Sequence, residues 1–112
     1  MKKIPYAKHN FSQEEINSVS DVLKNGWIAR GPKVNKFEEE FCSVLGYQHS
    51  VACTNGSAAI EIALRAAGVK AGDEVIVPTL TWASTATSVS MVGATPIFAD
   101  ITEDSYCISP ES

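Results

Sequence analysis

The sequence predicts an α/β fold with a mostly parallel sheet and flanking helices. From residue 50 onward, short apolar segments typical of buried strands, at 50–54, 74–78 and 95–100, alternate with helical patterns at 57–67 and 82–92. A β-α-β-α-β order of this kind joins parallel strands through right-handed crossovers. The length of 112 residues, with 45% apolar and 20% charged residues, is that of one globular domain or of a part of a larger one.

Two helices are expected before the sheet begins. Ser12 and Glu15 form a capping box that starts the first helix, and Gly26 supplies the left-handed residue that ends it. Pro32 can occupy the first turn of the second helix, which ends at Gly46. Apolar residues at helical spacing give each helix one apolar face: Ile16, Val19, Val22 and Leu23 in the first, and Val34, Phe37, Phe41 and Leu45 in the second.

Charge and hydropathy exclude several classes of function. The net charge is −4, and every lysine and arginine lies at or before Lys70, so residues 71–112 carry only acidic charge. A nucleic-acid surface needs clustered basic residues instead. No stretch approaches the roughly 18 consecutive apolar residues of a membrane span, and the first ten residues lack the apolar run of a secretory signal. The sequence therefore predicts a cytoplasmic protein that binds neither nucleic acid nor membrane.

The cysteines and histidines do not form a metal or redox motif. Cys42, Cys53 and Cys107 are odd in number and too widely spaced for a paired-ligand zinc motif or a redox pair, so we expect them to be reduced and mostly buried. His9 and His49 have no second ligand at metal-binding spacing. No metal site is predicted.

The turn between the strand at 50–54 and the following helix is the first candidate binding site. Gly56 permits a tight turn, Ser57 offers a hydroxyl, and the first N–H groups of the helix are available to an anion such as a phosphate or carboxylate. The alternative is an ordinary strand-to-helix turn with a serine cap, which is common in α/β domains. The motif matches neither a Walker A loop nor G-x-G-x-x-G.

Two further residues follow the carboxyl ends of strands, where ligands gather in open α/β sheets. Trp82 could stack on a planar ring beside neighbouring hydroxyl groups, although a tryptophan at a helix start commonly serves only packing. Asp100 ends the last strand in an acidic neighbourhood, and we interpret it as a structural residue of the turn.

Several short motifs, in order, resemble the DegT/DnrJ/EryC1/StrS family. This resemblance extends over essentially the whole chain and implies the aspartate aminotransferase fold (fold type I) and pyridoxal 5'-phosphate as cofactor. The motifs are Gly31-Pro32, Phe37-Glu38, Thr54-Asn55-Gly56-Ser57-Ala58-Ala59, Ala63-Leu64, Gly72-Asp73-Glu74-Val75-Ile76-Val77-Pro78, Thr81-Trp82-Ala83-Ser84-Thr85, Gly93-Ala94-Thr95-Pro96 and Ala99-Asp100.

The resemblance assigns roles to residues already singled out. It implies that Ser57 and the backbone N–H of Ala58, in the turn opened by Gly56, bind the cofactor phosphate. It also implies that Trp82 stacks on the pyridine ring, and that Tyr6 aligns with a substrate-side tyrosine of some relatives.

The resemblance also predicts that the chain consists of two parts. Residues 1–49 are expected to form N-terminal helices and, at Trp27 to Gly31, a loop that borders the active site at a dimer interface. Residues 50–112 are expected to form the first β-α-β-α-β part of the cofactor-binding large domain.

The chain lacks two segments that the family pattern contains. Relatives supply an acidic partner for the ring nitrogen from an Asp-x-x-Gln segment and the Schiff-base lysine from a Ser-x-x-x-x-Lys segment, and neither occurs before Ser112. Lys70 resembles an exposed charge rather than a buried amine. Ser109-Pro110-Glu111 has the form of a helix start, which suggests a truncated chain, although a frayed tail has the same composition. We expect the 112 residues alone to be inactive and to be poorly stable or to associate.

The resemblance therefore predicts the N-terminal part of a sugar aminotransferase that is a homodimer when full length. The whole enzyme would move an amino group from glutamate to a nucleotide-linked keto-deoxy sugar, for surface polysaccharide or aminosugar biosynthesis. One alternative is a sugar dehydratase of the same family, with histidine in place of the lysine. The other is a small α/β ligand-binding module without chemistry.

Overall fold

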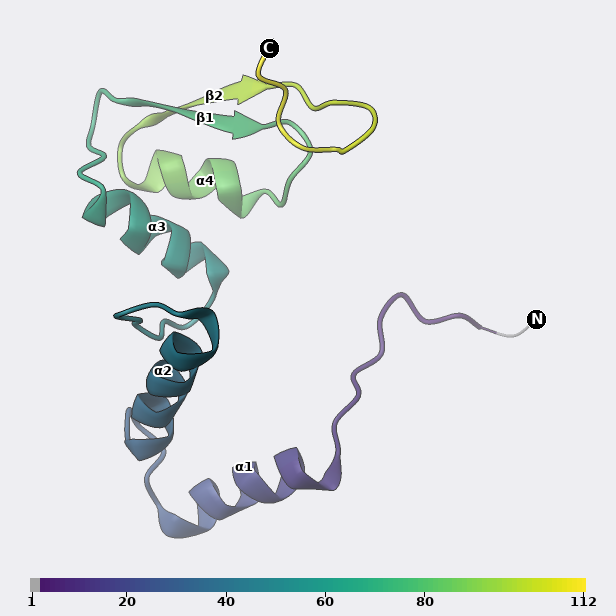
Figure 1. The fold of residues 1–112 in the computed structure, drawn as a ribbon, viewed down its shortest axis with the longest axis vertical. Helices are drawn as coiled ribbons and strands as arrows, with labels where there is room; N and C mark the ends of the chain where they lie inside the picture. Colours follow the sequence, from purple (N-terminus) through teal and green to yellow (C-terminus); the bar gives the residue numbers. More distant parts are fainter. Residues whose placement is uncertain (1–2) are drawn as a thin grey trace. The chain divides into compact units, whose positions relative to one another are not determined.

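The computed structural model describes residues 3–112 and divides into two compact units, Met1–Ala52 and Cys53–Ser112. The first unit is helical, and the second contains helices and a sheet (Figure 1). The elements in chain order are α1 (Gln13–Asn25), α2 (Pro32–Leu45), α3 (Gly56–Ala66), β1 (Glu74–Pro78), α4 (Ser84–Met91) and β2 (Thr95–Ala99).

Helix α1 begins at the predicted capping box. The Ser12 hydroxyl accepts a hydrogen bond from the backbone N–H of Glu14, and the Glu15 carboxylate accepts one from the backbone N–H of Ser12 at 2.6 Å. These bonds pair N–H groups that a helix start otherwise leaves free. The helix ends at Gly26, whose φ of 74° is left-handed. The predicted start and end of α1 are confirmed.

The capping box also makes α1 sensitive to pH. The Ser12 side chain is the largest cause that holds the pKa of Glu15 below its ordinary value. A carboxyl group whose pKa is lower in the folded state stabilises that state above the unfolded pKa, and this contribution is lost as the pH falls through the folded pKa. We expect Ser12→Ala to raise the Glu15 pKa toward its ordinary value, measured by NMR titration of the side-chain carboxyl.

Ser20→Ala is the matched control for this titration. Ser20 lies on the same helix, but its hydroxyl donates to the Ile16 carbonyl at 2.9 Å and does not contact Glu15. A Glu15 pKa that moves equally in both variants would show that the capping box is not its cause.

Helix α2 also has the predicted ends. Pro32 occupies the first turn, where its missing N–H costs no hydrogen bond, and Gly31 caps the helix without a side chain. Gly46 has a φ of 72° and donates its N–H to the Cys42 carbonyl. Such a left-handed glycine satisfies carbonyls at a helix end that have no partner within the helix.

The second unit is built on two parallel strands. β1 and β2 pair in register from Glu74 opposite Thr95 to Pro78 opposite Ala99. Figure 1 shows α4 lying along one face of this sheet, and α4 also packs against α3. The core of the unit lies between the sheet and the helices. Its buried members are Val77, Val89, Val92 and Ala94, with Leu64, Val69, Val75 and Ala86 packed against them.

The opposite face of the sheet is apolar and exposed. Ile76 of β1 is 67% exposed, and Ile97, its partner on β2, is 39% exposed. Parallel sheets in α/β proteins normally have both faces covered. Within residues 3–112, a helix covers only the face that packs against α4.

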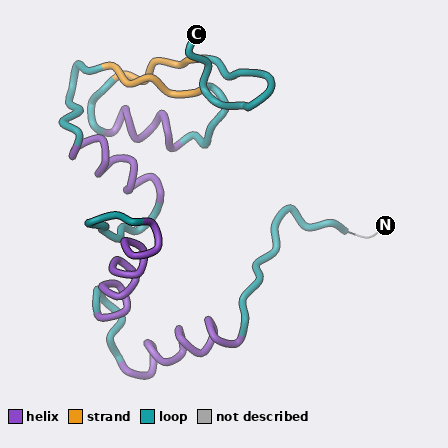
Figure 2. The backbone as a smooth tube through the Cα atoms, in the orientation of Figure 1, coloured by secondary structure: helices purple, strands orange, loops and turns teal. Residues whose placement is uncertain are grey.

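The α/β fold class with a parallel sheet is confirmed, but the strand predicted at 50–54 is wrong. Within residues 3–112, strands occur only at β1 and β2, drawn in orange in Figure 2. A strand needs a neighbour that exchanges backbone hydrogen bonds with it. Here the Ala52 N–H donates to Glu38 Oε1 at 2.8 Å, and the Ser50 hydroxyl donates to the Glu38 carbonyl at 2.8 Å.

The structure also describes the cysteines and the hydropathy of the helices. The three cysteines are free thiols, but Cys53 and Cys107 are exposed and only Cys42 is partly buried, so the expectation of mostly buried cysteines is wrong. Cys53 precedes an exposed turn and Cys107 lies in the C-terminal loop, and neither belongs to the valine core. Among the helices that the structure describes, none is long and apolar enough to cross a membrane.

Candidate functional site

The turn before α3 is capped by Asn55. The Asn55 Oδ1 accepts a hydrogen bond from the Ala58 N–H at 2.9 Å, and Gly56 and Ser57 are the first residues inside the helix. The serine cap considered from the sequence is therefore wrong, because Ser57 lies inside the helix. Asparagine is as effective an N-cap as serine. The Ala58 N–H already has a partner.

The N–H groups of Gly56 and Ser57 remain open. Within residues 3–112 no acceptor is hydrogen-bonded to either group, as expected for the first turn of a helix. A Cβ placed on Gly56 would meet no atom within 4 Å, so the space above the turn is open. The positive end of the helix dipole and these donors, together with the Ser57 hydroxyl, favour an anion.

A buried hydroxyl connects this turn to α4. Ser88 is completely buried, and its hydroxyl donates to the Ser57 carbonyl at 3.3 Å. Sequence reasoning missed Ser88, because a serine inside a helix pattern carries no signal of its contacts. The first turn of α3 is thereby bonded to the middle of α4.

Trp82 lies between β1 and α4 with an exposed side chain. It is 79% exposed, and its carbonyl accepts a hydrogen bond from the Thr85 N–H at 2.9 Å. The Thr81 and Thr85 hydroxyls are 2.9 Å apart and bond to each other beside it. The indole is therefore open to contact with another planar group.

Asp100 stabilises the turn after β2. Its Oδ1 accepts hydrogen bonds from the Ile101 N–H at 2.8 Å and from the Thr79 hydroxyl at 3.4 Å. Thr79 also donates its N–H to the Ala99 carbonyl at 3.0 Å. These contacts agree with the structural interpretation of Asp100.

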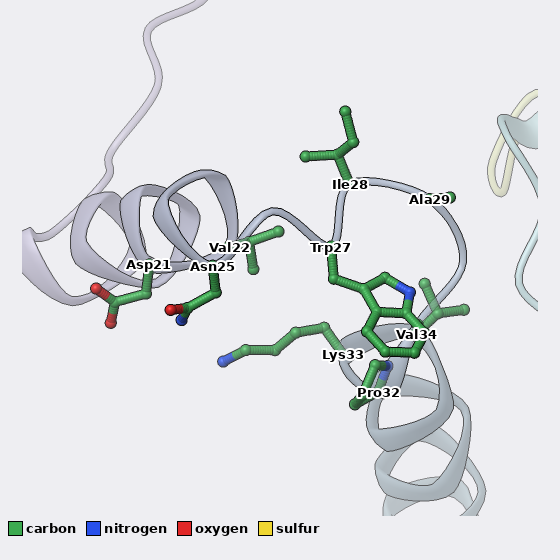
Figure 3. Close-up of a pocket in the computed structure, with 10 residues that line it drawn as sticks. Asp21, Val22, Asn25, Trp27, Ile28, Ala29, Pro32, Lys33 and Val34 are labelled. Carbon is green, nitrogen blue, oxygen red and sulfur yellow. The ribbon is translucent and has the colours of Figure 1, made fainter.

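The Trp27 loop of the first unit packs against the start of α2. The Trp27 Nε1–H donates to the Arg30 carbonyl at 3.1 Å, and a Cβ on Gly31 would lie 2.3 Å from Nε1. Gly31 therefore allows the indole to approach the backbone closely. Figure 3 shows the ring at the start of α2, where the loop and both helices of this unit line a mostly apolar pocket of about 450 Å³.

The Glu38 side chain joins two separate parts of the first unit. Its two carboxylate oxygens each lie 3.1 Å from Arg30 Nη2, and Oε1 also accepts from the Ala52 N–H. The Glu38 side chain is only 15% exposed, against 63% for Arg30. The Phe37-Glu38 motif was visible in the sequence, but not its partners, since these are 8 and 14 residues away.

The predicted site residues therefore fall into two groups. Gly56, Ser57 and Ala58 are contiguous at the start of α3, and Trp82 belongs to the same unit. Tyr6, the predicted substrate contact, is fully exposed and belongs to the other unit. In the part of the chain that the structure describes, no three His, Cys, Asp or Glu side chains are grouped to hold a metal ion.

Comparisons with known proteins cover nearly all of the chain. It is 45% identical over 107 residues to the spore coat polysaccharide biosynthesis protein SpsC of Bacillus subtilis (strain 168), a match that covers 96% of this chain and 28% of SpsC. The PLP form of Spr1654 from Streptococcus pneumoniae superposes with a TM-score of 0.90 at 34% identity, over 96% of this chain and 28% of that protein.

A third relative is named as a dehydratase. The GDP-4-keto-6-deoxy-D-mannose-3-dehydratase of E. coli, solved with bound hydrated PLP, superposes with a TM-score of 0.89 at 26% identity, over 99% of this chain and 30% of that protein. The chain thus spans a little over a quarter of the length of the relatives it matches. A sequence model of the DegT/DnrJ/EryC1/StrS aminotransferase family matches residues 9–112, and the chain therefore belongs to this family.

Proposed function

We propose that the full-length protein is a pyridoxal-phosphate-dependent sugar aminotransferase. It transfers an amino group from glutamate to a nucleotide-linked keto-deoxy sugar, in the synthesis of a surface polysaccharide or an aminosugar. Membership of an aminotransferase family and the similarity to SpsC support this proposal. The observation in the structure that supports it best is the open turn at Gly56 and Ser57, which presents unpaired N–H donors at a helix start.

The donor set of the turn fits the cofactor phosphate. Two backbone N–H groups and a hydroxyl are the donors that bind phosphate at helix N-termini. Ser57 and Gly56 can supply them directly. A contact from the Ala58 N–H requires this group to share its hydrogen with Asn55 Oδ1 and the phosphate, because the cap is already formed. Ser57 is therefore the stronger phosphate ligand of the two residues assigned by the resemblance.

Trp82 fits the pyridine ring. Its exposed indole can stack on one face of the ring and exclude water from that face. When bound, the cofactor supplies a pyridinium ring that withdraws electrons from the substrate carbon. The contribution of this chain is to anchor the phosphate and orient the ring, while the residues that hold the ring nitrogen and move the proton are expected outside these 112 residues.

The remaining assignments follow from the same family membership. Residues 1–49 are proposed as N-terminal helices with a loop that borders the active site, and residues 50–112 as the first part of the cofactor-binding domain. Tyr6 is proposed as a substrate contact. The full-length enzyme is proposed to be a cytoplasmic homodimer without metal, nucleic-acid or membrane ligands.

A sugar dehydratase is the second candidate, favoured by the similarity to the E. coli dehydratase. Both activities would use the same phosphate turn and the same ring contact. The residue at the Schiff-base position separates them, with lysine expected for an aminotransferase and histidine for a dehydratase.

The proposed function is tested on the full-length protein with and without cofactor. We expect the apoprotein to bind pyridoxal phosphate and then to convert glutamate to 2-oxoglutarate when a keto sugar nucleotide is supplied. Trp82→Ala should weaken cofactor binding about fivefold, since a stacked aromatic contact contributes on the order of 1 kcal/mol.

Trp82→Phe is the matched variant, because it keeps an aromatic face. It should bind the cofactor within about threefold of the unchanged protein. If Trp82→Ala binds the cofactor as tightly as the unchanged protein does, Trp82 is not part of the cofactor site. A product that has lost a sugar hydroxyl and carries no amino group would replace the aminotransferase by the dehydratase.

A further inference from the structure

Ser88 is a buried polar residue that the proposed function does not use. It lies in the middle of α4 with no exposed surface, and its only hydrogen bond across elements is the one to the Ser57 carbonyl, among the residues described. A hydroxyl buried at a helix contact needs a partner, because an unpaired one would cost free energy. The contact therefore fixes how α4 lies against the first turn of α3.

One proposed cofactor contact lies at the start of α3, and the other lies just before α4. Ser57 is the second residue of α3, and Trp82 lies two residues before α4 begins. Thr85, in the first turn of α4, is bonded to Trp82 through its N–H and to Thr81 through its hydroxyl. The position of Trp82 is thus coupled to α4, and α4 is coupled to the phosphate turn by Ser88.

This coupling matters for cofactor binding, because one cofactor molecule makes both contacts. Its phosphate and its ring belong to one small molecule, so both contacts form together only if the turn and the indole are held at the right spacing. A change in how α4 lies against α3 alters that spacing without removing either contact.

We propose that Ser88 is a positioning residue that sets the spacing between the phosphate turn and Trp82. This inference rests on the proposed function. It predicts a specific signature: loss of the Ser88 hydroxyl weakens a ligand that bridges both contacts and spares ligands that use only one. A residue that merely stabilises the fold would not discriminate among such ligands.

The test compares three probes on full-length apoprotein: pyridoxal phosphate, pyridoxal and inorganic phosphate. Dissociation constants are measured by titration for the unchanged protein and for Ser88→Ala. We expect Ser88→Ala to bind pyridoxal phosphate about threefold to tenfold more weakly, as for loss of one hydrogen bond. Its affinities for pyridoxal and for inorganic phosphate should stay within about twofold of the unchanged protein.

Ser90→Ala is the matched control. Ser90 is on the same helix and is exposed, and its hydroxyl donates only within α4, to the Ala86 carbonyl at 3.5 Å. It should leave all three affinities unchanged. Alanine is a good helix former, so neither substitution threatens α4.

The outcomes separate the two proposals. Unchanged binding of pyridoxal phosphate by Ser88→Ala, or equal weakening of all three probes, overturns the positioning role while the proposed function stands. An unchanged protein that binds no pyridoxal phosphate overturns both.

Discussion

Glu38→Ala is expected to lower the free energy of unfolding by about 2–3 kcal/mol, because a hydrogen bond to a charged group is lost and a partly buried donor is left without a partner. That donor is the Ala52 N–H, 2.8 Å from Glu38 Oε1. Arg30 contributes less, since its guanidinium is 63% exposed and water replaces the lost partner.

The local effect of this substitution is measured by amide hydrogen exchange at Ala52 in the full-length protein. A loss of about 2 kcal/mol corresponds to roughly 30-fold less protection. Glu38→Gln retains an oxygen that can accept from Ala52, so it should keep a larger share of the protection than Glu38→Ala.

Glu40→Ala is the matched control on the same helix. Glu40 pairs with Lys36 at 3.4 Å, and both side chains are about two-thirds exposed. Such i,i+4 pairs contribute about 0.3–0.5 kcal/mol, so protection at Ala52 should not change. Equal effects of Glu38→Ala and Glu40→Ala would mean that the contact with Ala52 carries no stability.

Val89→Ala is expected to lower the free energy of unfolding by about 2 kcal/mol, from lost apolar burial and the cavity that remains. Val89 is 1% exposed and lies in the cluster with Val77, Val92 and Ala94. Since α4 covers one face of the sheet, the cavity would open between α4 and β1. Urea denaturation of the full-length protein should show a lower midpoint.

Val44→Ala makes the same chemical change at an exposed position. Val44 is 81% exposed on α2, so little burial is lost and the unfolding free energy should change by less than about 0.5 kcal/mol. If the midpoints of the two variants coincide, the valine cluster is not the core of the second unit.

The ends of the first two helices could be predicted because their signals are local. The capping box at Ser12, the proline at the start of α2 and the left-handed glycines at 26 and 46 act within one turn of the backbone. The parallel pairing of β1 with β2 also followed from the alternation of apolar strands and helices. Each of these features depends on neighbours in the sequence or on a general rule of chain connection.

The prediction of a strand at 50–54 was wrong for a physical reason. Its apolar composition is compatible with a strand, but composition does not supply a neighbouring strand. The Ala52 N–H is satisfied by the carboxylate of Glu38, which is 14 residues earlier. The contact of Ser88 could not be predicted from the sequence for the same reason, because its partner Ser57 is 31 residues away.

The sequence by itself determined the family, the α/β class, the ends of α1 and α2 and the turn at Gly56 and Ser57, because these depend on residue types in order along the chain. Only the tertiary structure decided that Glu38 pairs with Arg30 and Ala52, and that Ser88 connects α4 to the turn. A hydrogen bond requires a particular distance and direction between two groups, and for residues far apart in sequence these are set by packing.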